Sequence, residues 1–218
     1  MVHRLISIDW GLKNSAVVLF LLNDDGDLFA YISPPCSALG MLDYERAHNN
    51  PVWIGALVSQ LLHNALMEYR KPGSPFWPFS DPEWVTEDPV NDVVIEAGNP
   101  PRPQNWAIIA AVTASMHMLF PRAMLHQQQR QQVMRHFGIP VGHGHDRSKQ
   151  ASISCLQNLV SRMDMVHNCT PQAEYLLAND HVCDALLQGL YTYRGRYRRL
   201  FIDAPATREV YSAPPLHA

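Results

Sequence analysis

Three acidic residues stand where predicted β-strands end or a predicted helix begins. Asp9 closes the apolar segment LISID, Glu96 closes DVVIE, and Asp184 lies in NDHVCDALLQGL at the start of the last predicted helix. An acid at the end of a buried strand must be paired, hydrated or bound to a metal ion. Because the ends of neighbouring strands meet at one edge of a sheet, we expect these side chains to lie close together.

Such a cluster of carboxylates has a characteristic chemistry. Three carboxylates that converge without a matching set of Lys or Arg side chains repel one another strongly. Mg²⁺ or Mn²⁺ relieves this repulsion, because these hard cations prefer oxygen ligands. Two such ions close together can activate a water molecule and stabilise the leaving oxygen of a phosphodiester. The acids therefore predict a site with two Mg²⁺ ions, for which Mn²⁺ can substitute.

The last predicted helix separates an apolar stripe from an acidic side. The stripe consists of Val182, Leu186, Gly189, Leu190 and Tyr193. Asp184 lies on roughly the opposite side of the helix, with Asp180 and His181 four and three residues before it. The stripe can therefore pack against the protein while the acidic side faces a cleft.

The segments that must position these residues predict a mixed α/β sheet. β-branched and apolar segments predict strands over 4–9, 16–22, 28–33, 92–97 and 122–127, the first three of them antiparallel. Periodicity or strong apolar character predicts helices over 52–69, 105–120, 128–137 and 149–163, and a last one from about 180. We therefore expect one sheet with helices on its faces.

The composition is that of a globular protein, with 47% hydrophobic and 17% charged residues in 218. We expect one domain over 1–202, a Pro-rich loop inserted at 70–90, and an irregular tail over 203–218. No apolar run is long enough to span a bilayer and none resembles a cleavable leader, so we expect an intracellular protein without a membrane partner. The four cysteines are widely spaced and predict neither a zinc ribbon nor a disulfide framework.

Basic residues are concentrated in two segments, although the net charge of −3 gives no general indication of nucleic-acid binding. The segment YRGRYRR interleaves Arg194 and Arg196 with Tyr193, which suits phosphate contact with stacking. A solvated helix end, where cations complement the macrodipole, is the alternative. The glycine-rich segment GHGHDR, which ends at Arg147, is interpreted as a DNA-contacting loop rather than a metal site.

Four motifs occur in the order found in RuvC-type Holliday junction resolvases, which belong to the RNase H and retroviral-integrase superfamily. They are ISIDWGLKNSAV, VVIEAGNPPRPQNW, DRSKQASI and HVCDALLQGL. The strings IDWGLKN and DALLQG are similar to the poxvirus and mitochondrial branch. The resemblance implies an RNase H-like fold, with a mixed five-stranded sheet and helices on both faces.

The resemblance also implies roles for individual residues. It places Asp9, Glu96 and Asp184 as metal ligands and His181 in the remaining ligand position, for which Asp180 is the alternative. It places Lys149 near the scissile phosphate, and we expect Lys149 and the nearby Arg147 to contact DNA. Taken singly, each acid could equally be a turn former or a helix-start acid. Their joint occurrence in the family's order favours the catalytic interpretation.

The function implied is a Mg²⁺-dependent endonuclease that cuts four-way DNA junctions as a symmetric homodimer. Arg102, after the second motif, would contact the DNA backbone. The apolar helix over 105–120 would pair the subunits, with core burial as the alternative. Two other functions remain open: an RNA-processing nuclease of the same superfamily, and a non-catalytic module that binds nucleic acid or nucleotide.

Overall fold

The computed structural model describes residues 3–11, 15–22, 28–32, 50–69, 90–97, 103–141, 145–162 and 177–196. The predicted loop at 70–90, apart from residue 90, and the predicted tail at 203–218 lie outside the described residues. The domain boundaries therefore stay predictions. None of the described helices combines the length and the apolar character needed to cross a membrane.

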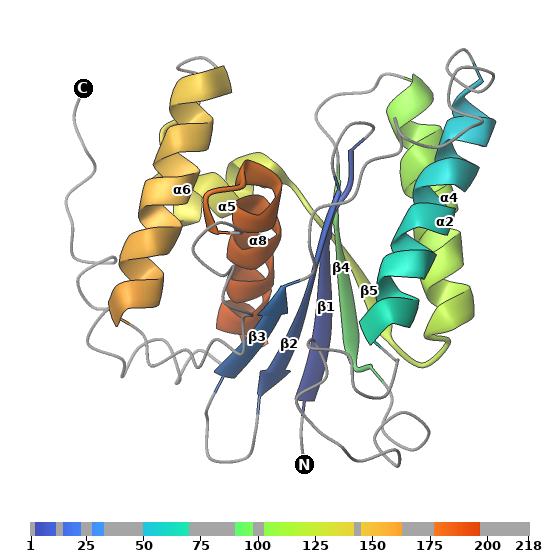
Figure 1. Ribbon diagram of the computed structural model, residues 1–218, viewed down its shortest axis with the longest axis horizontal. Helices are drawn as coiled ribbons and strands as arrows, with labels where there is room; N and C mark the ends of the chain where they lie inside the picture. The colour runs from blue at the N-terminus through green and yellow to red at the C-terminus, as the bar shows by residue number, and fades with distance from the viewer. Residues whose placement is uncertain are drawn as a thin grey trace.

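The described strands form one mixed sheet in the order β3-β2-β1-β4-β5 (Figure 1). The strands are β1 (His3–Asp9), β2 (Ala16–Leu22), β3 (Leu28–Ile32), β4 (Asp92–Glu96) and β5 (Met124–Gln128). β1, β2 and β3 pair in antiparallel fashion, whereas β1, β4 and β5 pair in parallel. Ile8 is opposite Ile95, so the next residues, Asp9 and Glu96, lie at the same edge of the sheet.

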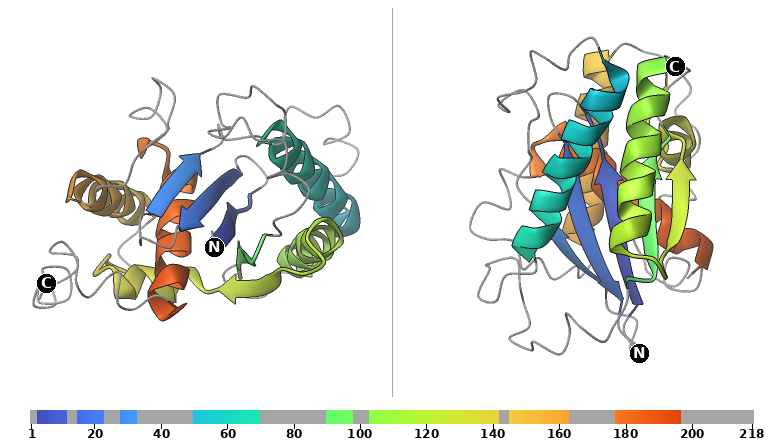
Figure 2. Two further views of the ribbon diagram at one scale, coloured as in Figure 1. Left: turned by 90° about the horizontal axis from the view of Figure 1, so that it is seen from below. Right: turned by 90° about the vertical axis from the view of Figure 1, so that its right-hand side faces the viewer.

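Helices cover both faces of this sheet, as Figures 1 and 2 show. On one face lie α2 (Pro51–Tyr69) and α4 (Pro103–Leu119), and on the other lie α5 (Arg130–His136), α6 (His145–Arg162) and α8 (Asp180–Arg196). The mixed α/β architecture predicted from the sequence is confirmed. Each layer has its own apolar core.

Strand periodicity divides the two cores. In β1, Leu5 contributes to the core under α8, whereas Ile6 and Ile8 contribute to the core under α2 and α4. The central strands are buried on both faces, which explains why their sequences are almost continuously apolar. Asp9 shares its face with Leu5, so its carboxyl points toward α8.

The boundaries of two predicted helices are corrected by the structure. The loop expected to extend to residue 148 ends earlier, because α6 already begins at His145. Ser148 is buried and its Oγ lies 3.8 Å from Met134 Sδ of α5, so tertiary packing supports this extra turn. Lys149 consequently lies in the second turn of α6 and is not a helix-start residue. The helix predicted over 128–137 is shorter, since Gln128 belongs to β5 and α5 begins at Arg130.

Two close approaches fix the helices on the sheet and on each other. A Cβ atom at Gly189 of α8 would overlap the ring of Phe20 in β2. A Cβ atom at Gly55 of α2 would lie 2.9 Å from the Ala111 Cβ of α4. Glycine at these positions therefore allows contacts that a side chain would prevent.

We expect Gly189→Ala to lower the free energy of unfolding by about 1–3 kcal/mol, because the added methyl group must displace a fully buried ring. Urea denaturation followed by circular dichroism measures this change. Ser154→Ala, at an exposed position of α6, is the control and should change stability by less than about 0.5 kcal/mol. Equal stabilities of the two variants would contradict the close packing of α8 on β2.

Candidate active site

The structure brings together the three acids on which the sequence interpretation rests. Asp9 ends β1, Glu96 ends β4, and Asp184 lies in the second turn of α8. Asp9 is only 5% exposed and shares a hydrogen bond with Glu96. The charge of Asp184 acts on both of these carboxyl groups. The expected convergence of the acids is therefore present in the described structure.

Burial and mutual repulsion change the protonation of this group. Burial raises the pKa of Asp9 to about 8, and the neighbouring Asp184 carboxylate adds to the increase. Burial also raises the pKa of Glu96 well above its ordinary value, and the charge of Asp9 contributes to this rise. The protonated Glu96 carboxyl donates the hydrogen bond that Asp9 accepts. At neutral pH the pair therefore retains at least one proton unless another cation replaces it.

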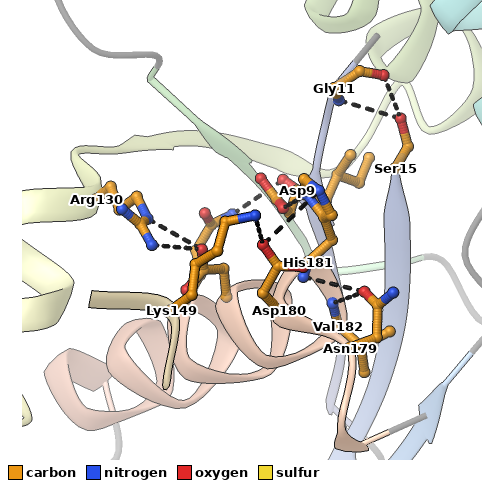
Figure 3. A network of polar contacts seen from close by, with 12 residues as sticks. Asp9, Gly11, Ser15, Arg130, Lys149, Asn179, Asp180, His181 and Val182 are labelled. Carbon is orange, nitrogen blue, oxygen red and sulfur yellow. Dashed lines mark hydrogen bonds and ion pairs between the residues drawn. The ribbon is translucent and has the colours of Figure 1, made fainter. Parts of the chain in front are cut away.

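His181 contacts the acid pair from the start of α8. Its Nδ1 lies 2.7 Å from Asp9 Oδ2, as Figure 3 shows. Asn179 caps the helix, because its Oδ1 accepts hydrogen bonds from the backbone N–H groups of His181 and Val182. The cap holds the first turn of α8 in the orientation that directs His181 at Asp9.

Asp180, the alternative ligand, has a different partner. Its Oδ2 lies 2.5 Å from the Nζ of Lys149, which reaches over from α6 (Figure 3). Burial alone would raise the pKa of Asp180, but the Lys149 hydrogen bond and the nearby His181 outweigh it and lower that pKa. Asp180 is thus an ionised partner of Lys149, whereas His181 is the residue that contacts Asp9.

Arg130 is a site residue that the sequence interpretation missed. Both its Nε and its Nη2 lie 2.9 Å from Asp184 Oδ2. Burial tends to lower the pKa of Arg130, but the charges of Asp184, Glu96 and Asp9 outweigh this and raise it. A cation as the first residue of a helix opposes the macrodipole, and this was the available indication of a specific partner. Arg130 reaches the site because β5 lies next to β4, so α5 begins at the acidic edge.

Two further hydrogen bonds connect the elements that carry the acids. Trp10 Nε1 donates to the backbone oxygen of Glu96 over 2.8 Å and so ties the end of β1 to the end of β4. Gln188 Nε2 donates to the backbone oxygen of Ile8 over 3.3 Å and ties α8 to β1. Neither partner could be identified from sequence, because each receiving atom is a backbone oxygen.

A second acid of β4, Asp92, is buried and is paired with two histidine side chains. Asp92, at the opposite end of this strand, has one carboxylate oxygen 2.6 Å from His126 Nε2 and the other 3.0 Å from His3 Nε2. Two imidazoles from the flanking strands therefore partner this carboxylate. The two ends of one short strand thus carry an acid with fixed side-chain partners and an acid that holds a proton.

The predicted DNA-contacting residues have different environments. Arg147 is exposed on α6. Arg194 contacts His136 Nδ1 and lies 5.0 Å above the Tyr191 ring, and burial together with the Arg194 charge lowers the pKa of His136 to about 4. Arg102 and the side chain of Arg196 lie outside the described residues. The predictions for these four arginines stay open.

The predicted stacking role of Tyr193 is wrong. Its side chain is buried, its hydroxyl donates to the backbone oxygen of His3 over 3.3 Å, and its ring packs edge-on against Phe20. Tyr193 belongs to the apolar stripe of α8, and packing on β1 and β2 takes precedence over exposure at the helix end. It is a core residue.

The donor set fits a hard divalent cation. Carboxylate oxygens and one imidazole meet where burial, and after it the repulsion between like charges, raises the pKa values of two acids, and a cation would relieve that repulsion. In the described parts of the chain, however, no three His, Cys, Asp or Glu side chains are already grouped so that they could hold a metal ion. The residues therefore suit the ion chemically, but their side chains must move to bind it.

Comparison with solved structures places the fold among Holliday junction resolvases. The fowlpox virus resolvase in complex with substrate Holliday junction DNA is 13% identical, with a TM-score of 0.50 over 89% of this chain and 99% of that one. The yeast mitochondrial Holliday junction resolvase is 11% identical, with a TM-score of 0.50 over 90% and 84%. No protein-family model and no curated protein matches the sequence. The likeness shows that the chain has the RNase H-like fold of these resolvases.

We expect Asp9→Asn to make thermal stability less dependent on pH when divalent cations are absent. The folded protein binds more protons than the unfolded chain between the ordinary Asp pKa of 3.8 and about 8. The wild type therefore loses stability as pH rises through this range, whereas the variant has no Asp9 proton to lose. Melting temperatures in EDTA from about pH 5 to 8 measure the two profiles.

Asp180→Asn is the matched control for this experiment. Its folded-state pKa is lowered, so the stabilising charge of Asp180 is already complete above the ordinary pKa. This variant should follow a pH profile parallel to that of the wild type. A parallel profile for Asp9→Asn as well would show that burial does not perturb Asp9.

Proposed function

We propose that this protein is a Mg²⁺-dependent endonuclease that resolves four-way DNA junctions by paired, symmetric phosphodiester hydrolysis. The observation that carries the proposal is the meeting of Asp9, Glu96, Asp184 and His181 at one edge of an RNase H-like sheet. The fold shared with the fowlpox virus and yeast mitochondrial resolvases supports a nuclease. Neither argument suffices alone, since a fold can carry many functions.

In the proposed site, Asp9, Glu96, Asp184 and His181 would hold two Mg²⁺ ions, and Mn²⁺ would substitute. When bound, such ions supply an activated water and stabilise the leaving oxygen. Lys149 would stabilise negative charge on the phosphate, because its Nζ approaches the start of α8 from α6 and would face the phosphate. Asp180 keeps Lys149 in position, which favours His181 as the ligand.

DNA contact would come from cations at the surface around this edge. Arg147 is exposed on α6, two residues before Lys149. Arg102, Arg194 and Arg196 are the further candidates taken from the motif order and the basic segment. Because the net charge is −3, binding should depend on the shape and backbone of the junction.

A homodimer would match the near two-fold symmetry of a four-way junction and provide two equivalent sites. We propose that α4 forms this interface. It contributes Ile108, Val112 and Met116 to the core, yet leaves Trp106 59% and Met118 83% exposed. Large apolar side chains in contact with water are candidates for an interface.

The decisive test is cleavage of a synthetic four-way junction with Mg²⁺ or Mn²⁺, in parallel with duplex DNA, flaps and structured RNA. We expect nicks at symmetric positions of the junction, and Asp184→Asn should reduce the cleavage rate by at least about 10³-fold. Gel mobility should show that this variant binds the junction at least as tightly as the wild type, because the cations that contact DNA are all retained. Preferential cutting of structured RNA would favour the RNA-processing alternative.

We expect Met118→Glu to increase the monomer fraction in sedimentation velocity experiments, because two carboxylates would face each other across a two-fold interface. Met124→Glu, at an exposed position of β5, is the control with the same charge change. If both variants sediment like the wild type, α4 is not the interface.

A further inference from the structure

Arg130 is the cation that partners the acidic edge in the described structure. One oxygen, Asp184 Oδ2, accepts a hydrogen bond from Nε of this guanidinium and lies 2.9 Å from its Nη2. The side chain of Arg130 is 24% exposed and that of Asp184 is 14% exposed, so the pair lies at the rim of the site. Asp9, which is buried, and Glu96, which is half-buried, are the other acids of this edge.

This pairing conflicts with metal binding at the same carboxylate. Arg130 occupies Asp184 Oδ2, so an ion that coordinates this oxygen must compete with the guanidinium for it. A guanidinium beside a divalent cation also repels it. The described side chains do not form a ready metal site, so some group must move when an ion binds.

Asp9 and Glu96 are held more firmly in place than the side chain of Arg130. Asp9 lies on a central strand and contacts His181, and Trp10 joins its strand end to that of Glu96. Arg130 is a long side chain at the rim, and it can rotate toward solvent without breaking the core. The movement that admits the ion therefore falls on the Arg130–Asp184 pair.

The guanidinium released from Asp184 could pair with a DNA phosphate. Two divalent ions bring more positive charge to the site than Arg130 does, so its charge is no longer needed there. The negatively charged group that arrives next is a DNA phosphate, and the planar guanidinium matches its oxygens. Arg130 would exchange a carboxylate partner for a phosphate partner.

We propose that Arg130 is a counter-ion displaced by metal: it pairs with Asp184 in the metal-free protein and is released by divalent cations to bind a DNA phosphate. This inference rests on the proposed function and adds a coupling between its two ligands. By linkage, metal strengthens DNA binding through Arg130, and DNA strengthens metal binding to the same extent.

Binding of Mn²⁺ alone, measured by electron paramagnetic resonance without DNA, tests the first half. Arg130→Gln should bind Mn²⁺ about 3- to 10-fold more tightly than the wild type, because it removes a competing cation. Arg135→Gln, an exposed position of the same helix, has the same charge change and should match the wild type. Arg130→Lys keeps the charge and should fall between them.

Junction binding in Ca²⁺ or EDTA tests the second half. The wild type and Arg135→Gln should bind the junction more tightly in Ca²⁺, whereas Arg130→Gln should lose most of this gain and match them in EDTA. Weaker or unchanged Mn²⁺ binding by both Arg130 variants would overturn the inference, because Arg130 would then support Asp184 as a ligand. Failure of the wild type to bind Mn²⁺ or cut junctions would instead overturn the proposed function, and the inference with it.

Discussion

The site depends on one constraint: a buried carboxyl group, Asp9, and a half-buried one, Glu96, lie side by side at the end of a parallel strand pair. Asp9 and Glu96 cannot both ionise in that position without a compensating cation, as their raised pKa values show. Two neighbouring groups act on this charge: His181 contacts Asp9, and Arg130 pairs with Asp184 beside it. The fold holds the acids together against their repulsion, which is the condition under which a divalent ion binds strongly.

The two ends of β4 show that an acid at the end of a strand can either have fixed histidine partners or share a proton with another acid. Asp92 is held between His3 and His126, and this arrangement joins the starts of β1 and β4 to the middle of β5. Glu96, at the other end, shares a proton with another acid. The residue type is nearly the same, and its partners determine the role. This is why the position of an acid at a strand end is informative only when its neighbours are known.

Much of the fold and the acidic edge could be predicted from sequence, because both depend on local patterns. Strand periodicity located β1 and β4, and the motif order linked their terminal acids to the start of α8. The partners could not be predicted in the same way. Arg130, Trp10 and Gln188 act across the sheet, and only the pairing of β4 with β5 or the packing of α8 brings them to the site. Tyr193 belonged to two patterns, the apolar stripe and the basic segment, and its burial shows that the stripe was the correct guide.

The close fit of Gly189 on Phe20 has a consequence for how defects in this protein would present themselves. Gly189 is five residues from Asp184, about 7.5 Å along the helix axis, and α8 has no room at that point to slide or lift. The packing of Gly189 in the hydrophobic layer therefore helps to fix where the other end of the helix places Asp184 at the acidic edge. A substitution that disturbs this packing in the core would therefore also shift Asp184. Its effect could resemble that of a substitution of Asp184 itself.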